Sequence, residues 1–175
     1  MIEKSMFKKL AIISFLVKKL HERCPSKQIG KTIVQKMVYL LSREKIVDYS
    51  YSMYHYGPYS TEVDSDLNLC KALDMLRVSW VENKGYFIGL GDDNEKYEGL
   101  LEEEEKEKIE KIVDKYGVYD AKEISIIATA LFLKEIAEIP SDDEIVKIII
   151  SMKPEYDEKY VRKILEKSNI IPQKQ

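Results

Sequence analysis

The chain has 175 residues, of which 45% are hydrophobic and 34% are charged, a balance that excludes an intrinsically disordered protein. Its longest apolar runs fall well short of the roughly 20 residues that a membrane-spanning helix needs, and two cysteines are too few for a disulfide framework. We therefore expect a cytoplasmic globular protein without a membrane segment, built as one domain or as a small domain with a helical extension.

The net charge of −3 conceals an uneven distribution of charge along the chain. Residues 1–60 carry 11 Lys and Arg against 4 Asp and Glu, whereas residues 61–120 carry 8 against 17. A basic segment beside an acidic one is consistent with solvated helix faces, with self-complementary packing, or with a basic surface that contacts a polyanion. Charge alone therefore leaves nucleic acid open as a partner.

Apolar spacing predicts two helices in the first 45 residues. In the first helix, apolar residues recur at alternating intervals of four and three, which is typical of one buried face: Met6, Leu10, Ile13, Val17 and Leu20. Pro25 ends this segment. The second helix is predicted to begin at Thr32, because Thr32 and Gln35 have the spacing of a capping box.

The tyrosine-rich stretch that follows, from residue 49 to residue 60, is predicted to connect the second helix to a third. Alternating side chains over Tyr49–Met53 predict a short strand, and Gly57-Pro58 is predicted to turn the chain. Ser60 is a favourable N-cap for the third helix, whose apolar stripe extends to Leu76.

After the third helix, alternation over residues 78–81 and 86–90 predicts a β-hairpin. Helix, helix, short strand, helix and hairpin is the element order of a winged helix, a variant of the helix-turn-helix. Helix-start signals then recur at Glu102, Asp120, Ser141 and Asp157. The predicted fold class is mainly α: a winged-helix-like unit with a small β-hairpin wing (1–90), a linker (91–99) and a C-terminal helical region (100–175).

Two sequence motifs resemble a known family. Gln35-Lys36-Met37-Val38-Tyr39-Leu40-Leu41, followed by Tyr54-His55-Tyr56-Gly57-Pro58-Tyr59-Ser60, resembles the signature of Panacea-type, SocA-like antitoxin domains. The chain is more similar still to the related YwgA-like family, whose tail resembles residues 121–129 and 152–154. The resemblance implies a winged-helix or helical interaction domain that holds a protein partner, in some members a toxin, and that is not an enzyme.

The tyrosine-rich stretch supplies the candidate partner-binding residues, which are Tyr54, His55, Tyr56, Gly57, Pro58 and Tyr59. Aromatic rings with a polar end are enriched at binding hot spots, and Tyr49 and Tyr51 share this chemistry. The same rings would suit a core with a hydrogen-bonded rim, so both interpretations stay open. Tyr39 is predicted to pack beneath them.

The third helix is a poor candidate for insertion into a DNA groove. It is acidic, with Glu62, Asp64, Asp66 and Asp74 against Lys71. Carboxylates facing a groove are repelled by the phosphates that dominate affinity for DNA. The alternative nucleic-acid surface is the basic N-terminal third, with Lys18, Lys19, Arg23, Lys27 and Lys31.

No residue pattern predicts catalysis, a cofactor or a metal site. His55 has no nucleophile or orienting acid at a diagnostic spacing. His21 and Cys24 are two of the four ligands that a closed zinc site needs. We therefore predict a non-enzymatic binding module, antitoxin-like or regulatory, whose partner is a protein such as a toxin-like protein. The alternative is a dimeric winged-helix transcriptional regulator that binds DNA through the basic N-terminal third.

Overall fold

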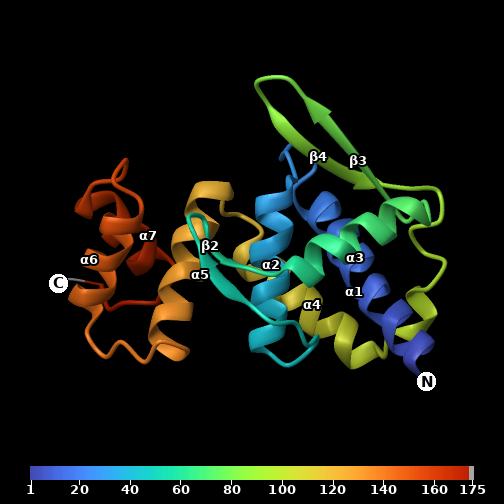
Figure 1. Cartoon of the computed structure of the whole chain (residues 1–175), viewed down its shortest axis with the longest axis horizontal. Helices are drawn as coiled ribbons and strands as arrows, with labels where there is room; N and C mark the ends of the chain where they lie inside the picture. The colour runs from blue at the N-terminus through green and yellow to red at the C-terminus, as the bar shows by residue number, and fades with distance from the viewer. Residues whose placement is uncertain (174–175) are drawn as a thin grey trace.

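The computed structural model describes residues 1–173 and shows a mainly helical molecule with two small β-hairpins (Figure 1). Within these residues the helices are α1 (Ile2–Arg23), α2 (Lys31–Arg43), α3 (Thr61–Ala72), α4 (Glu103–Tyr116), α5 (Ala121–Glu135), α6 (Asp142–Met152) and α7 (Glu158–Lys167). The strands are β1 (Ser52–Tyr54), β2 (Gly57–Tyr59), β3 (Leu76–Val81) and β4 (Gly85–Leu90), and a short 3-10 helix, η1 (Glu98–Leu100), precedes α4. The predicted fold class, mainly α with a β-hairpin followed by a C-terminal helical region, is confirmed. Across residues 1–173, no helix combines the length and the apolar character needed to cross a membrane.

The second hairpin, β3–β4, follows α3 as predicted and projects from the body of the molecule (Figure 1). Its antiparallel register runs from Leu76 opposite Leu90 to Val81 opposite Gly85. Leu76 therefore begins β3, and the prediction that it extends the stripe of the third helix is wrong. The chain leaves the helix at Asp74, whose φ of 54° lies in the left-handed region and is incompatible with a continuing α-helix.

A hydrophobic core joins the N-terminal elements to the C-terminal helices. Helix α4 packs on α1, and α5 packs on both α2 and β2, while α6 and α7 pack on α5 and on each other. In Figure 1, α5 accordingly lies between the α6–α7 pair and the remaining helices. The division of the chain at residues 91–99 stays a prediction. The contact of α5 with both α2 and β2 places the tyrosine-rich stretch between the N-terminal and C-terminal helices.

Side-chain caps fix several of the helix starts that the sequence predicts. The Ser60 hydroxyl accepts a hydrogen bond from the backbone N–H of Val63, and the Asp157 carboxylate accepts one from Tyr160. Asp120 caps α5 in the same way. Helix α2 differs, because it begins at Lys31 with Gly30 as its N-cap and has no side-chain cap. The capping box predicted from Thr32 and Gln35 is therefore wrong, and the Gln35 side chain has another role.

Candidate functional site: the tyrosine hairpin

The tyrosine-rich stretch folds into a hairpin of two three-residue strands, β1 and β2. Tyr54 pairs with Gly57, so His55 and Tyr56 form the turn between them. The prediction that Gly57-Pro58 turns the chain is wrong, because both residues belong to β2 and are buried. The reason is steric: a Cβ on Gly57 would clash with the Thr129 Oγ1 atom of α5, so only glycine lets the strand approach this closely.

Lys36 holds the hairpin from the side of α2. Its side chain is buried, with only 2% of the residue exposed, and its Nζ atom donates a hydrogen bond of 2.9 Å to the carbonyl oxygen of Pro58. Burial, together with repulsion by the Lys153 ammonium group, lowers the pKa of Lys36 to about 8. A buried lysine is thus used to fix the main chain of the hairpin.

Lys153 holds the turn from the side of the C-terminal helices. It is the residue that follows α6, it is also 2% exposed, and its Nζ atom donates a hydrogen bond of 2.6 Å to the carbonyl oxygen of His55. The ammonium group lies 5.4 Å from the centre of the Tyr56 ring. Burial lowers the pKa of this lysine as well. Two lysines from distant parts of the sequence therefore contact one short hairpin.

Gln35 fixes the end of the hairpin. Its side-chain amide donates to the carbonyl oxygen of Ser60 at 2.9 Å and accepts from the Ser60 N–H at 3.1 Å, and both residues are buried. Because Ser60 also caps α3, Gln35 orders the exit from the hairpin and the start of the helix together. Buried main-chain groups need such partners, and the side chain of Gln35 satisfies both groups of Ser60.

The tyrosines of this stretch divide into a buried set and an exposed set. Tyr39 packs edge to face against Tyr51, with ring centres 5.1 Å apart, as predicted for a residue beneath the cluster. Tyr49 is only 7% exposed, and its hydroxyl donates to the Asp66 carboxylate. Burial raises the pKa of Tyr39, Tyr49 and Tyr51 well above the ordinary tyrosine value. Tyr49 is therefore part of the core.

The exposed set lies at the end of the hairpin. Tyr54 is 53% exposed and Tyr56 is 67% exposed, and His55 between them is also exposed. Tyr59 is half-buried, with its ring centre 5.1 Å from that of Tyr54. We call Tyr54, His55 and Tyr56 the hairpin tip. Of the six predicted site residues, these three are available to a partner, whereas Gly57 and Pro58 anchor the hairpin to α5 and α2.

A cavity of about 380 Å³ lies between the hairpin and the first turns of α2. We call it the hairpin cavity, and its walls include Lys31, Thr32, Lys36, Tyr54, Tyr56, Tyr59 and Asp64. Lys31 is paired with Asp64 at 3.2 Å, whereas Lys36 has no carboxylate within salt-bridge distance among residues 1–173. The cavity thus combines aromatic walls with one unpaired positive charge.

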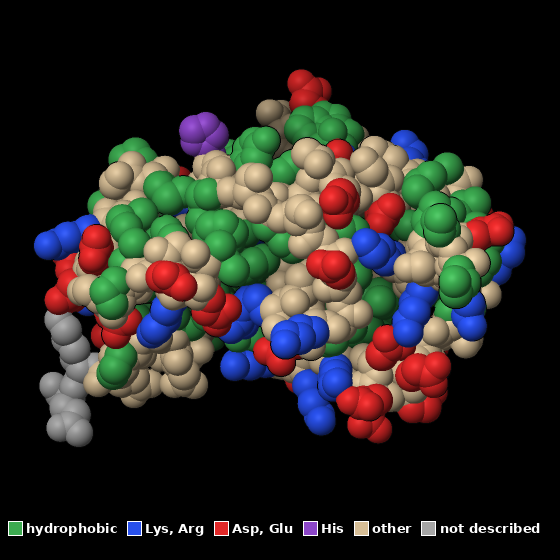
Figure 2. Space-filling model, turned by 60° about the horizontal axis from the view of Figure 1, so that its bottom comes forward, with side chains coloured by type: hydrophobic (Ala, Val, Ile, Leu, Met, Phe, Trp, Pro, Cys, Tyr) green, Lys and Arg blue, Asp and Glu red, His purple; other side chains and the backbone are tan. Residues whose placement is uncertain are grey.

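The basic residues of the alternative nucleic-acid surface are engaged within the protein. Lys18 contacts Glu95 and Glu98, and Lys19 contacts Glu22 and Glu110. Arg23 pairs with Asp114 at 2.7 Å, and Lys27 donates to the carbonyl oxygens of Gly117 and Tyr119 at the end of α4. Burial alone would lower the pKa of Lys18, but its two carboxylate partners raise it, and hydrogen bonds to carboxylates likewise raise the pKa of Lys19 and Arg23. On the face in Figure 2, basic and acidic side chains are interspersed in the same manner.

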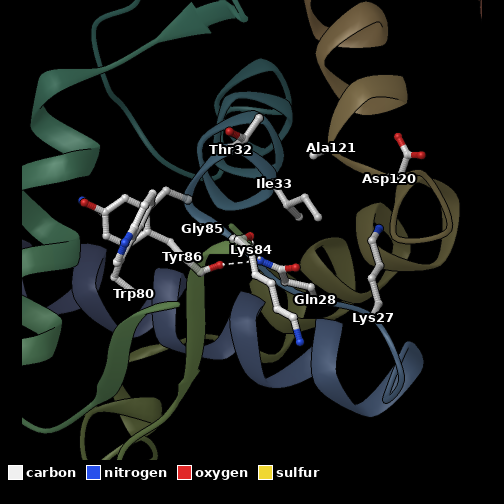
Figure 3. Close-up of a pocket in the computed structure, with 12 residues that line it drawn as sticks. Lys27, Gln28, Thr32, Ile33, Trp80, Lys84, Gly85, Tyr86, Asp120 and Ala121 are labelled. Atoms are coloured by element: carbon white, nitrogen blue, oxygen red, sulfur yellow. Dashed lines mark hydrogen bonds between the residues drawn. The ribbon is translucent and has the colours of Figure 1, made fainter. Parts of the chain in front are cut away.

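A second cavity, of about 500 Å³, lies between the start of α2 and the β3–β4 hairpin (Figure 3). Trp80 and Tyr86 form one side of it, with ring centres 4.9 Å apart, and Lys27 and Asp120 lie on the opposite side (Figure 3). Gln28 donates to the carbonyl oxygens of Lys84 and Tyr86. This cavity contains Lys27 and Lys31 of the alternative surface, but Lys27 points its ammonium group at main-chain carbonyls that follow α4.

The two histidines and the two cysteines contact different parts of the protein. The Nε2 atom of His21 lies 2.7 Å from the carbonyl oxygen of Ile88, and Cys24 donates to the carbonyl oxygen of Gly117. Cys70 is buried beneath α1, and burial raises the pKa of its thiol to about 12. His55 presents its ring at the hairpin tip. Among residues 1–173, no three His, Cys, Asp or Glu side chains form a group that would hold a metal ion.

No family model and no curated protein matches the chain. The contacts of Gln35, Lys36 and Tyr39 nevertheless give their sequence pattern a structural reason, since all three hold the tyrosine-rich stretch. Lys36 was missed as a site residue, although its position three residues after the buried Ile33 places a charge in an apolar stripe. Lys153 gave no comparable signal, because its partner lies 98 residues away in the sequence.

Proposed function

We propose that this protein is a non-enzymatic binding module that holds a segment of another protein on the hairpin tip. The observation that carries the proposal is the combination of two exposed tyrosines with a main chain that is fixed by buried side chains. Tyr54 and Tyr56 are each more than half exposed, and Lys36, Lys153 and Gln35 fix the residues around them.

Rigidity matters because binding is opposed by the loss of conformational freedom. A mobile loop must be ordered when a partner binds, whereas a hairpin that is already fixed avoids most of that cost. Tyrosine adds contact area with few rotatable bonds and has a hydroxyl that can form hydrogen bonds. The hairpin tip has both properties, which supports a recognition role over a purely structural one.

The resemblance to the YwgA-like family and to Panacea-type antitoxin domains extends the proposal. It suggests that α1, α2, α3 and the β3–β4 hairpin form a winged-helix-like unit, that the module is antitoxin-like or regulatory, and that its partner is a toxin-like protein in the cytoplasm. A DNA-binding regulator is less well supported. Lys18, Lys19 and Arg23 are each paired with carboxylates, and α3 presents Glu62 and Asp64 where a groove-reading helix would need positive charge.

Peptide display tests the proposal with partner segments of any sequence. Peptides selected on the immobilised wild-type protein would be measured by calorimetry against the variant Tyr54→Ala/Tyr56→Ala. We expect affinity to fall at least tenfold, as it does when hot-spot aromatic residues are truncated. The melting temperature should change little, because both side chains are exposed.

Trp80→Ala provides the matched control. Trp80 is 64% exposed on the β3–β4 hairpin, so its removal takes away a comparable exposed aromatic surface at a different place. Selected peptides should bind this variant as they bind the wild type. Equal loss of affinity in both variants would indicate non-specific adhesion to aromatic side chains, and unchanged affinity in the tyrosine variant would exclude the hairpin tip as the binding site.

A further inference from the structure

We propose that the hairpin cavity binds a carboxylate group of the partner segment, with the Lys36 ammonium group as its counter-charge. The inference rests on the proposed function, because it states the chemistry of the segment that the hairpin tip holds. It concerns a different feature of the site, namely an unpaired buried charge next to the exposed rings.

Two buried ammonium groups beneath the hairpin have no carboxylate partner among the described residues. Removing an ammonium group from water is unfavourable unless an opposite charge or a sufficient set of hydrogen bonds compensates for it. Lys36 and Lys153 are both 2% exposed, and each has one hydrogen bond, to the carbonyl oxygen of Pro58 and of His55 respectively, among the described residues. Neither has a carboxylate partner there, whereas Lys18, Lys19 and Lys31 have one or two each.

Lys36 has N–H donors that no described residue uses. A lysine ammonium group has three N–H donors, and the contact with Pro58 uses one of those of Lys36. Lys36 also forms part of the wall of the hairpin cavity, so a group in the cavity is within reach of its side chain. Tyr54, Tyr56 and Tyr59 line the same cavity, and their hydroxyls make no hydrogen bond to another described residue. An acceptor that enters the cavity therefore has donors available from Lys36 and from these hydroxyls.

The charges on the cavity wall match an anion with a single negative charge. The cavity wall contains two lysines and one carboxylate, and Lys31 and Asp64 are paired with each other at 3.2 Å. Lys153 is not part of this wall, so the remaining charge there is that of Lys36, which matches one negative charge. A carboxylate carries one, whereas a phosphate monoester carries nearly two and needs additional cationic groups. The tyrosine rings would contact the apolar part of the same segment. An acidic side chain or the C-terminal carboxylate of a peptide fits this combination.

The test uses a pair of probes that differ only in charge. Ligand-observed NMR would compare 3-phenylpropanoate with 3-phenylpropanamide on the wild-type protein at pH 7. We expect the carboxylate to bind at least tenfold more tightly than the amide, and Lys36→Met to reduce its affinity by at least tenfold. Lys31→Met is the matched control on the same cavity wall, and it should reduce affinity less than threefold because Asp64 already neutralises Lys31. If Lys36→Met fails to fold, the comparison of acid with amide on the wild type still decides the matter.

The peptides selected by display then identify the source of the carboxylate. In those peptides, replacing the acidic residue with its amide, or amidating the C-terminus, should weaken binding tenfold or more in the wild type but not in Lys36→Met. Equal binding of phenylpropanoate and phenylpropanamide would overturn the inference while leaving the tyrosine-dependent binding of peptides intact. If phenylpropanoate binds but the display experiment selects no peptide at all, the cavity is a site for small free carboxylates. That result would contradict the role assigned to a partner segment.

Discussion

The Nζ atom of Lys36 and the carbonyl oxygen of Pro58 are 2.9 Å apart, although the two residues are separated by 22 positions and belong to different elements. The neighbouring residue Gln35 binds the main chain of Ser60. One turn of α2 thus fixes β2 and its exit through main-chain atoms.

Gly57→Ala should strongly destabilise the protein. The φ of Gly57 is +97°, where an L-residue is strained, and the new Cβ would clash with Thr129 Oγ1. We expect the free energy of unfolding to fall by about 2–4 kcal/mol, measured by urea denaturation. Adding Thr129→Ala should restore only the part of the lost free energy of unfolding that comes from the clash with Oγ1, because the strain at φ +97° remains. Gly99→Ala is the control, because a Cβ there meets nothing within 4 Å and should change stability by less than about 0.5 kcal/mol.

Gln35→Leu should destabilise the protein more than the same change at Gln28. Loss of the Gln35 amide leaves the buried N–H of Ser60 without a partner and removes one of the two hydrogen bonds to its C=O, which also accepts from the N–H of Asp64; this should lower the free energy of unfolding by about 1–3 kcal/mol. Gln28 also donates to two main-chain carbonyl oxygens, but it is exposed, and water can replace its bonds. Urea denaturation of both variants gives the comparison. Equal effects would mean that Gln35 does not clamp the hairpin exit.

The stability of the protein should rise with pH above about 8. The pKa of Lys36 is about 8 in the folded protein but near the ordinary value of 10.5 when the chain unfolds. Between these values the unfolded chain binds more protons, so removing protons favours the folded state. From pH 7 to pH 9 the Lys36 contribution to the free energy of unfolding should increase by about 1 kcal/mol. Urea denaturation at a series of pH values measures the change.

Lys36→Met supplies the reference for the pH series, since it keeps Lys153 and the buried tyrosines in place. From pH 7 to pH 9, the free energy of unfolding of the wild type should increase relative to that of Lys36→Met. Parallel stability curves would show that the folded protein does not perturb the titration of Lys36. Measurements above pH 10 are less useful, because the raised pKa values of Tyr39, Tyr49 and Tyr51 then act in the opposite direction.

Duplex DNA should bind weakly and with little dependence on salt. The ion pairs of Lys18, Lys19 and Arg23 occupy most of the positive charge that the alternative surface would use to contact phosphates. Fluorescence anisotropy with a labelled non-specific duplex at low and at moderate salt is the measurement. Tight binding that decreases steeply between these conditions would instead favour the DNA-binding regulator.

Most of the fold could be predicted from local patterns in the sequence. The apolar stripe of α1 from Leu10 to Leu20, the Ser60, Asp120 and Asp157 caps and the alternation in β3–β4 depend on neighbouring residues, and all are present in the structure. Met6, predicted to begin the buried face of α1, is instead 39% exposed, one turn before the buried part of the helix. The errors arose where tertiary contacts decide the conformation. Gly57-Pro58 has the composition of a turn, but close contact with α5 places it in a strand.

The candidate site could be predicted only in part, because tertiary contacts decide which of its residues are exposed and what its polar side chains bind. Exposure of Tyr54 and Tyr56 and burial of Tyr49 cannot be read from their shared residue type, because position relative to α2 and α3 decides which ring reaches solvent. Gln35 was predicted to cap its own helix, yet its partner is Ser60. Lys153 binds a residue far away in the sequence, and pairing of that kind leaves no local pattern.

Because the hairpin is anchored through main-chain atoms, its backbone conformation does not depend on which side chains its tip carries. Because Lys36, Lys153 and Gln35 contact the backbone of Pro58, His55 and Ser60, the side chains at positions 54, 55 and 56 take no part in these hydrogen bonds. These three positions are therefore open to diversification while the scaffold is retained. A library randomised at these three positions would resemble the variable loops of an antibody, in which varied side chains on one conserved scaffold give new binding specificities.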